Sequence, residues 1–187
     1  MIGAGAADLE ALLAAGQEAL RGPDRLYLVA ATSHLAEGWR SRVPRLELAG
    51  AAAAEGPIRA AAAARGVELV WESPADVIPL PSGWEARCRP LTPRTSHPAP
   101  VFHFDPYSVV LRLIARGDEP DYVVALDYLR HGWVDFARLE ALHTEVVPRF
   151  TSATLAQDPA EFRRKFRGLR QLHLTGFRPA PILAPLT

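Results

Sequence analysis

Apolar residues in the first part of the chain occur either in short runs or at helical spacing, and the two patterns alternate. Leucines and alanines after Asp8 recur every three or four residues until Gly22-Pro23, as in an amphipathic helix. Short apolar runs bounded by turn residues predict strands. The predicted elements that follow are strands at 26–30, 45–49, 67–71 and 101–104, the last at or near the sheet edge, and helices at 33–39 and 57–65. Strands that alternate with helices favour an α/β (α+β) fold with a small mixed or partly parallel sheet.

The second part of the chain has helical spacing throughout. Asp105-Pro106 and Asp158-Pro159 each place a carboxylate acceptor before a proline that needs no donor, which is typical of a helix start. Glu161 completes a capping box with Asp158. The predicted helices cover 106–116, 119–130, a segment from 136 onward and a segment from 159 onward with Phe162, Phe166, Leu169 and Leu172 on one face. We expect an α/β part at 1–104, a helical part at 105–173 packed on it, and a Pro-rich extended tail at 174–187.

Length and composition restrict the class of protein. The 187 residues suit one domain with a sizeable core, and a formal net charge of zero excludes a globally basic nucleic-acid binder. The single cysteine, Cys88, excludes an intramolecular disulfide and a cysteine-based zinc site. The chain has neither an apolar run long enough for a membrane span nor a basic segment before an apolar N-terminus. We therefore expect a cytoplasmic protein that does not bind membranes.

Charge is unevenly distributed even though it sums to zero. Between residues 159 and 187 six cationic side chains accompany one acid, so this segment carries +5 and the remainder −5. On the last predicted helix, Arg163, Arg167 and Arg170 follow one another at i, i+4 and i+7, opposite the phenylalanine stripe, and Arg164 lies beside them. Such a face could bind nucleic-acid phosphates or an acidic partner protein, and the competing interpretation is an ordinary solvated surface.

Two dense motifs mark the centre of the chain. They are DVIPLPSGWEARCRPL at 76–91 and HFDPYSVVLRLIARGDEPD at 103–121, and a third motif, DPAEFRRKF, follows at 158–166. Together they resemble a bacterial domain-of-unknown-function family with a minimal nucleotidyltransferase fold, related to the nucleotidyltransferase-like antitoxins of abortive-infection systems. The resemblance covers about residues 26–172 and implies a small mixed sheet with flanking helices, followed by a helical half.

An active nucleotidyltransferase needs a particular set of groups. Two divalent cations are held by carboxylates at i and i+2 of one strand and by a third carboxylate on a neighbouring strand, and a small-residue turn precedes the next helix. This chain has Val-Ala-Ala-Thr-Ser at that turn and Arg45-Leu46-Glu47 on the strand, so a cation replaces the first ligand. The resemblance therefore implies a remnant site, formed by Arg45, Thr32, Ser33 and Asp121, that has lost catalysis and needs no cofactor.

Two functional hypotheses remain open. The favoured one is a catalytically degenerate protein that binds a partner protein or nucleic acid, as an antitoxin or a scaffold would, with the Pro-rich tail available to a second copy. The alternative is an active enzyme that uses Mg²⁺ and a nucleoside triphosphate to transfer NMP to a protein or RNA acceptor, with Glu47, Glu68 and Asp76 as catalytic carboxylates. The competing interpretation of these three carboxylates is that Glu47 and Glu68 face solvent on their strands and that Asp76 caps a turn.

Overall fold

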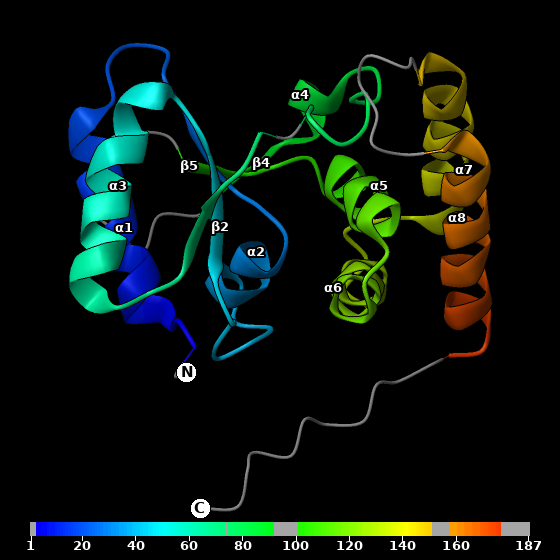
Figure 1. Ribbon diagram of the computed structural model, residues 1–187, viewed down its shortest axis with the longest axis horizontal. Coiled ribbons are helices and arrows are strands. Elements are labelled where there is room, and N and C mark those ends of the chain that lie inside the picture. The colour runs from blue at the N-terminus through cyan, green and yellow to red at the C-terminus, as the bar shows by residue number, and fades with distance from the viewer. Residues whose placement is uncertain (1–2, 74, 92–100, 151–157, 177–187) are drawn as a thin grey trace, which may run out of the picture.

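In the part of the chain that the structure describes, five strands form a mixed sheet that separates two helical layers (Figure 1). The computed structural model describes residues 3–73, 75–91, 101–150 and 158–176. The first half contains α1 (Ala6–Ala19), β1 (Leu26–Leu28), α2 (Ala31–Ala36), β2 (Leu46–Gly50), α3 (Ala52–Arg65) and β3 (Leu69–Trp71). The second half contains α4 (Trp84–Arg87), β4 (Arg89–Pro90), β5 (Val101–His103), α5 (Pro106–Arg116), α6 (Glu119–Arg130), α7 (Phe136–Val146), the 3-10 turn η1 (Val147–Arg149) and α8 (Pro159–Leu174).

The strands lie in the order β3-β2-β1-β5-β4. β2 is parallel to β3 and antiparallel to β1, β1 is parallel to β5, and β4 covers β5 in the antiparallel sense. The sheet is therefore mixed, as the sequence pattern predicts, and β5 lies next to the edge strand.

Side chains that alternate along the central strands separate the two layers. Leu26, Leu28, Leu46 and Leu48 point to the face covered by α1 and α3, where they form one apolar cluster with those helices. α1 and α3 approach each other closely, since a Cβ on Gly16 would lie 2.5 Å from Ile58 Cδ1. The opposite face packs against α5 and α6, and α7 and α8 lie beyond them, farthest from α1 and α3 (Figure 1).

A buried ion pair joins the two central motifs of the sequence. Asp105, fully buried at the N-terminus of α5, accepts hydrogen bonds from Arg87 Nη2 at 2.7 Å, Ser108 Oγ at 2.7 Å and the Tyr107 amide at 3.2 Å. Arg87 comes from α4, at the end of the Pro-Leu-Pro-Ser-Gly segment. Asp105 is therefore a helix N-cap, as the sequence predicts, and the first motif is fixed to α5 through its arginine.

Three details differ from the sequence-based expectation. α3 begins at Ala52 instead of residue 57. Pro57 is its sixth residue and removes one backbone hydrogen bond, while burial of Ala54 and Ile58 stabilises the helix on both sides of it. α4 and β4 are too short to carry a readable period and were not predicted. α8 continues through Leu174, where the extended tail was expected to begin, and residues 177–187 of that tail lie outside the described part. In the described part, no helix has the length and apolar character that crossing a bilayer requires.

Histidine rings are enclosed in the core. His34 is fully buried between the rings of Trp39 and Tyr128, and neither ring nitrogen has a hydrogen-bond partner among the described residues. The nearest acid is Asp127, with Oδ2 3.7 Å from Nδ1. Burial lowers the pKa of His34 to about 3, although the Asp127 carboxylate opposes the shift.

We predict that replacing Asp105 by Ala lowers the free energy of unfolding by about 3 kcal/mol, because the largely buried Arg87 would lose its anion. Urea denaturation followed by circular dichroism would measure the change. Asp158→Ala is the matched control, since Asp158 is also an Asp-Pro N-cap but is solvent-exposed, and it should cost about 1 kcal/mol. Equal losses in the two variants would contradict the role of the buried pair.

We also predict that stability falls as the pH is lowered through the ordinary titration range of histidine. The unfolded chain takes up a proton at His34 near its ordinary pKa of 6.5, whereas the folded chain does not until about 3. Between about pH 7.5 and about pH 5, His34 alone should cost about 2 kcal/mol in the free energy of unfolding. Urea midpoints of His34→Phe should depend less on pH than those of the parent, whereas the exposed-site variant His173→Gln should behave like the parent.

Candidate functional site

A cluster of three carboxylates and three arginines lies where the sheet meets α5 and α6. Glu47 is the second residue of β2, and its side chain points to the α5–α6 face because Leu46 and Leu48 point to the other. Glu72 directly follows β3, and its amide donates to Leu48 O at 2.7 Å, which places it beside β2. The third carboxylate, Asp121, comes from the first turn of α6.

Glu47 is neutralised by an arginine two residues before it. Arg45 donates to Glu47 Oε1 from Nε at 3.0 Å and from Nη2 at 2.8 Å. The Glu47 side chain is 5% exposed, and this contact occupies acceptor positions of its Oε1. Burial raises the pKa of Glu47, and the guanidinium groups of Arg45 and Arg116 oppose the rise.

Glu72 is held by α5. Its Oε2 is bonded to Arg112 Nη2, and its Oε1 lies 3.5 Å from Arg116 Nη1. Glu72 and Arg112 are both buried, and Arg112 Nε and Nη1 have no hydrogen-bond partner among the described residues. Glu72 therefore supplies the main compensation for a guanidinium taken out of water.

Arg116 connects all three carboxylates. Its Nη2 lies 2.9 Å from Asp121 Oδ1 and 3.9 Å from Glu47 Oε1, in addition to the contact of Nη1 with Glu72. Three anions thus face three cations, and the cluster has no net charge when all six groups are ionised. In the described part of the chain, no three His, Cys, Asp or Glu side chains are placed to hold a metal ion.

The structure does not place the predicted catalytic carboxylates together. Glu68 is exposed just before β3, and Asp76 is exposed in a turn, where its Oδ1 accepts from Ser73 Oγ at 2.8 Å. Only Glu47 belongs to the cluster. The interpretation that Glu47 faces solvent was wrong, because the residue is 4% exposed beneath Arg45 and Arg116.

Most residues of the predicted remnant site do converge. Arg45 and Asp121 contact Glu47 and Arg116 respectively, and Thr32 Oγ1 accepts from the Glu47 amide at 2.7 Å. Ser33 is buried near them but donates to Leu28 O at 3.2 Å. Thr32 and Ser33 therefore brace the start of α2 against the strands.

Sequence reasoning missed Glu72, Arg112 and Arg116. The signals were present but weak: Glu72 follows the third apolar run at the spacing that places it on the same face as Val70, and the two arginines are separated by one helical turn in α5. An arginine inside an apolar helix is a sign of a buried acidic partner, but the sequence does not identify which acid that is.

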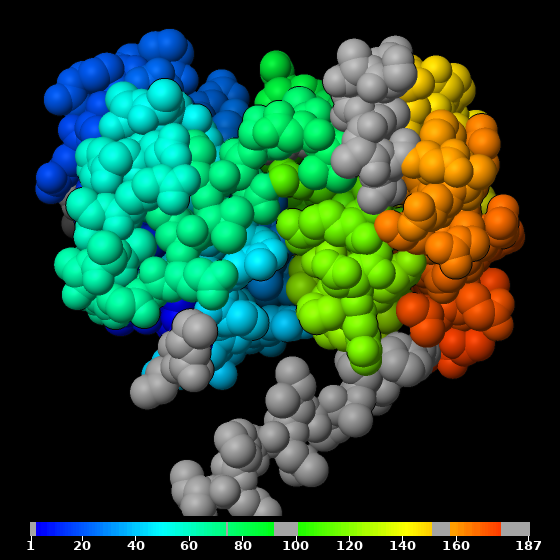
Figure 2. All heavy atoms as spheres, in the orientation of Figure 1, coloured from blue at the N-terminus to red at the C-terminus, as the bar shows by residue number. Residues whose placement is uncertain are grey.

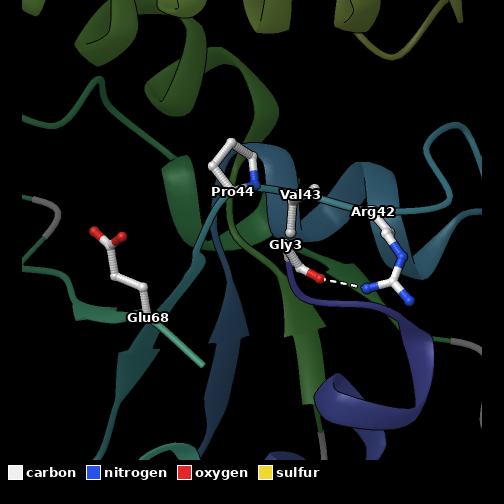
Figure 3. A pocket seen from close by; sticks show the side chains of 5 residues that line it. All are labelled: Gly3, Arg42, Val43, Pro44 and Glu68. Carbon is white, nitrogen blue, oxygen red and sulfur yellow. Dashed lines mark hydrogen bonds between the residues drawn. The ribbon is translucent and has the colours of Figure 1, made fainter. Parts of the chain in front are cut away.

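A separate surface pocket lies at the N-terminal edge of β2 and β3 (Figure 3). Gly3, Arg42, Val43, Pro44 and Glu68 line it, and Arg42 Nη1 donates to Gly3 O at 2.6 Å. In Figure 3 the Glu68 carboxylate points away from Arg42, so the two charges do not converge on one ligand position. The pocket includes none of the clustered carboxylates.

The predicted basic face lies on α8, at the opposite end of the molecule from α1 and α3 (Figure 2). Its members are all exposed: Arg163, Arg164, Arg167 and Arg170. The buried positions between them, Phe162, Phe166 and Leu169, turn inward.

Comparison of the chain with family models, with curated proteins and with solved structures finds no match.

We predict that Glu72→Gln lowers the free energy of unfolding by about 3 kcal/mol, because Arg112 would keep its charge in the interior without an anion. Chemical denaturation measures the loss. Glu68→Gln changes the net charge equally at an exposed position and should stay within about 0.5 kcal/mol of the parent. A Glu72→Gln protein as stable as the Glu68→Gln control would contradict the buried pairing.

Proposed function

We propose that this chain is a nucleotidyltransferase-like protein that no longer transfers nucleotides and acts by binding a partner. The observation that carries the proposal is that arginines already contact each carboxylate of the cluster. Arg45 and Arg116 lie against Glu47, while Arg112 and Arg116 lie against Glu72.

The placement of the acids supports the nucleotidyltransferase part of the proposal. Nucleotidyl transfer needs carboxylates at i and i+2 of one strand and another on a neighbouring strand, all on one face. Residues 45 and 47 are an i and i+2 pair leading into β2, and Glu72 follows the parallel neighbour β3. The same elements therefore provide each required position, but with an arginine at the first.

The turn between β1 and α2 provides independent support. Ala30 has a φ of 49°, in the region that favours glycine, directly before the helix that braces β2. Its carbonyl accepts from Tyr128 Oη at 3.1 Å, a contact that holds this backbone. Ala30 thus has a backbone conformation typical of glycine at the turn where an active enzyme would use small residues, so that backbone amides can approach the phosphates.

The arginines oppose catalysis in two ways. Mg²⁺ needs free oxygen lone pairs at short distance, and Arg45 already donates twice to Oε1 of Glu47. In addition, the Arg45 guanidinium repels the cation, so metal binding at Glu47 would require this partly buried ion pair to break. Without a metal pair, the charge that develops on a transferring phosphoryl group is not stabilised. A role in binding is what remains for the scaffold, with a protein or a nucleic acid as partner.

We predict that the parent protein shows no saturable Mg²⁺-dependent binding of nucleoside triphosphates and that Glu47→Ala changes nothing in this respect. Arg45→Asp should gain Mg²⁺ affinity, because it removes the repelling cation and restores the i and i+2 carboxylate pair. Isothermal titration calorimetry with Mg²⁺, then with Mg²⁺ and ATP, measures both.

Arg45→Ala is the matched control, since it removes the cation without adding a ligand. Gain of metal binding in Arg45→Asp alone supports the remnant site. Saturable Mg²⁺-dependent nucleotide binding by the parent that disappears in Glu47→Ala would overturn the proposal and favour the active enzyme.

A further inference from the structure

We infer that the outward face of α8, formed by Arg163, Arg164, Arg167 and Arg170, binds the phosphate backbone of duplex DNA. The inference rests on the proposed binding role and names its partner. It does not depend on the state of the carboxylate cluster, to which these four side chains do not belong.

Packing on the inner side of α8 fixes which residues face outward. Phe162 stacks on Phe150 with ring centroids 5.1 Å apart, and Phe166 stacks on His143 at 4.1 Å. Leu169 is fully buried on the same side. Because successive residues are rotated by about 100° around a helix, these contacts turn Arg163, Arg167 and their neighbours toward solvent.

The cations of α8 are divided between inward and outward roles. Lys165 turns inward, where its Nζ donates to the carbonyl oxygens of Ala115 and Arg116, each at 2.8 Å, at the C-terminus of α5. It also lies 3.2 Å from Glu161, the single acid of the helix. Lys165 therefore satisfies a helix end and is not part of the outward face.

The outward arginines are largely uncompensated. Arg164 lies 3.8 Å from Glu161, and Arg170 lies 3.8 Å from Glu140 of α7, both at exposed and weakly paired positions. Arg163 and Arg167 form no ion pair with any residue in the described ranges. Below Arg163, burial and the Arg163 charge lower the pKa of His143 to about 4, so the ring is neutral at neutral pH and adds no charge to this face.

The chemistry of the face favours a duplex phosphate backbone over other anions. Each guanidinium offers a planar pair of donors that matches a phosphate. Residues 163 to 170 span about 10 Å of helix, and duplex DNA carries one charge per about 1.7 Å, a density that a folded acidic protein does not match. Both phenylalanines in the described part of α8 are buried, so neither is available as the base-stacking platform that single-strand binders use.

The position of α8 in the molecule makes the face accessible despite the zero net charge. Figure 2 shows α8 along one end of the molecule, with α1 and α3 at the other end. At physiological salt, electrostatic interactions are screened beyond about 8 Å, so distant acids weaken this local field little. A helix about 10–12 Å across fits the major groove of B-DNA, about 12 Å wide, whereas the major groove of A-form RNA is narrow.

The test uses fluorescence anisotropy with a labelled DNA duplex of about 20 base pairs at several salt concentrations. We expect the affinity of the parent to fall with salt with a log–log slope of about −2 to −4, as expected for two to four phosphate contacts. Arg163→Glu/Arg167→Glu should weaken binding at least about tenfold at low salt and make the slope less negative by about 2, with an unchanged melting temperature.

Arg21→Glu/Arg59→Glu is the matched control, because it changes the net charge equally at two exposed residues near α1 and α3, and it should retain the parent affinity within about twofold. Equal weakening in both double variants, or no binding of duplex DNA by the parent, would overturn the inference. So would tighter binding of the matching single strand, of an RNA duplex or of poly-glutamate at equal charge. Titration of the parent and the same variants with Mg²⁺ and ATP separates the two proposals. Saturable Mg²⁺-dependent ATP binding would overturn the proposed loss of nucleotide transfer, whereas the inference that α8 binds duplex DNA would still rest on the anisotropy data.

Discussion

The neutralisation of buried carboxylates by arginine is the interaction on which the rest of this structure depends. Transferring an unpaired carboxylate out of water costs several kcal/mol, so each of these anions needs a cation with hydrogen-bond geometry. Asp105 receives one from α4, and Glu72 receives one from α5. Because the partners of each pair come from different elements, the pairing also fixes where those elements lie. Arg116 does this most extensively, since it contacts β2, the residue after β3, and α6.

The same pairs determine what the cluster can do chemically. A set of clustered carboxylates can be compensated by metal ions and substrate, in which case the site is incomplete until it is loaded. It can also be compensated by the protein's own cations, in which case the site is complete on folding. The Arg45–Glu47 contact belongs to the second kind, and its guanidinium keeps its charge over the physiological pH range. A metal ion at Glu47 would then have to displace this contact.

Much of the fold could be predicted from the sequence, because local signals dominate it. Asp105-Pro106 and Asp158-Pro159 start helices by capping chemistry, Gly66 and Gly117 end them at positive φ, and alternating runs define the central strands. The membership of the cluster could not be predicted in full, because it is set by tertiary register. Glu68 and Glu72 have the same alternation along the chain, and both hydrogen-bond to β2 through their backbones. Only Glu72 also lies against the arginines of α5, and it is buried while Glu68 is exposed. The motifs likewise did not identify Arg112 as a member of the cluster, because its partner Glu72 is 40 residues away in the sequence.

The distribution of paired and unpaired cations connects the cluster with α8. Ion pairs with carboxylates of the same chain already occupy the arginines at 45, 87, 112 and 116, so these side chains are not free to bind a ligand. The single lysine of the chain, Lys165, donates hydrogen bonds to two carbonyl oxygens at the C-terminus of α5. Arg163 and Arg167 form no ion pair within the described residues. The aromatic packing beneath them nevertheless fixes the position of their helix. A rigid helix that presents uncompensated guanidinium groups loses little conformational entropy of the backbone on binding, so its capacity for recognition lies in these charges.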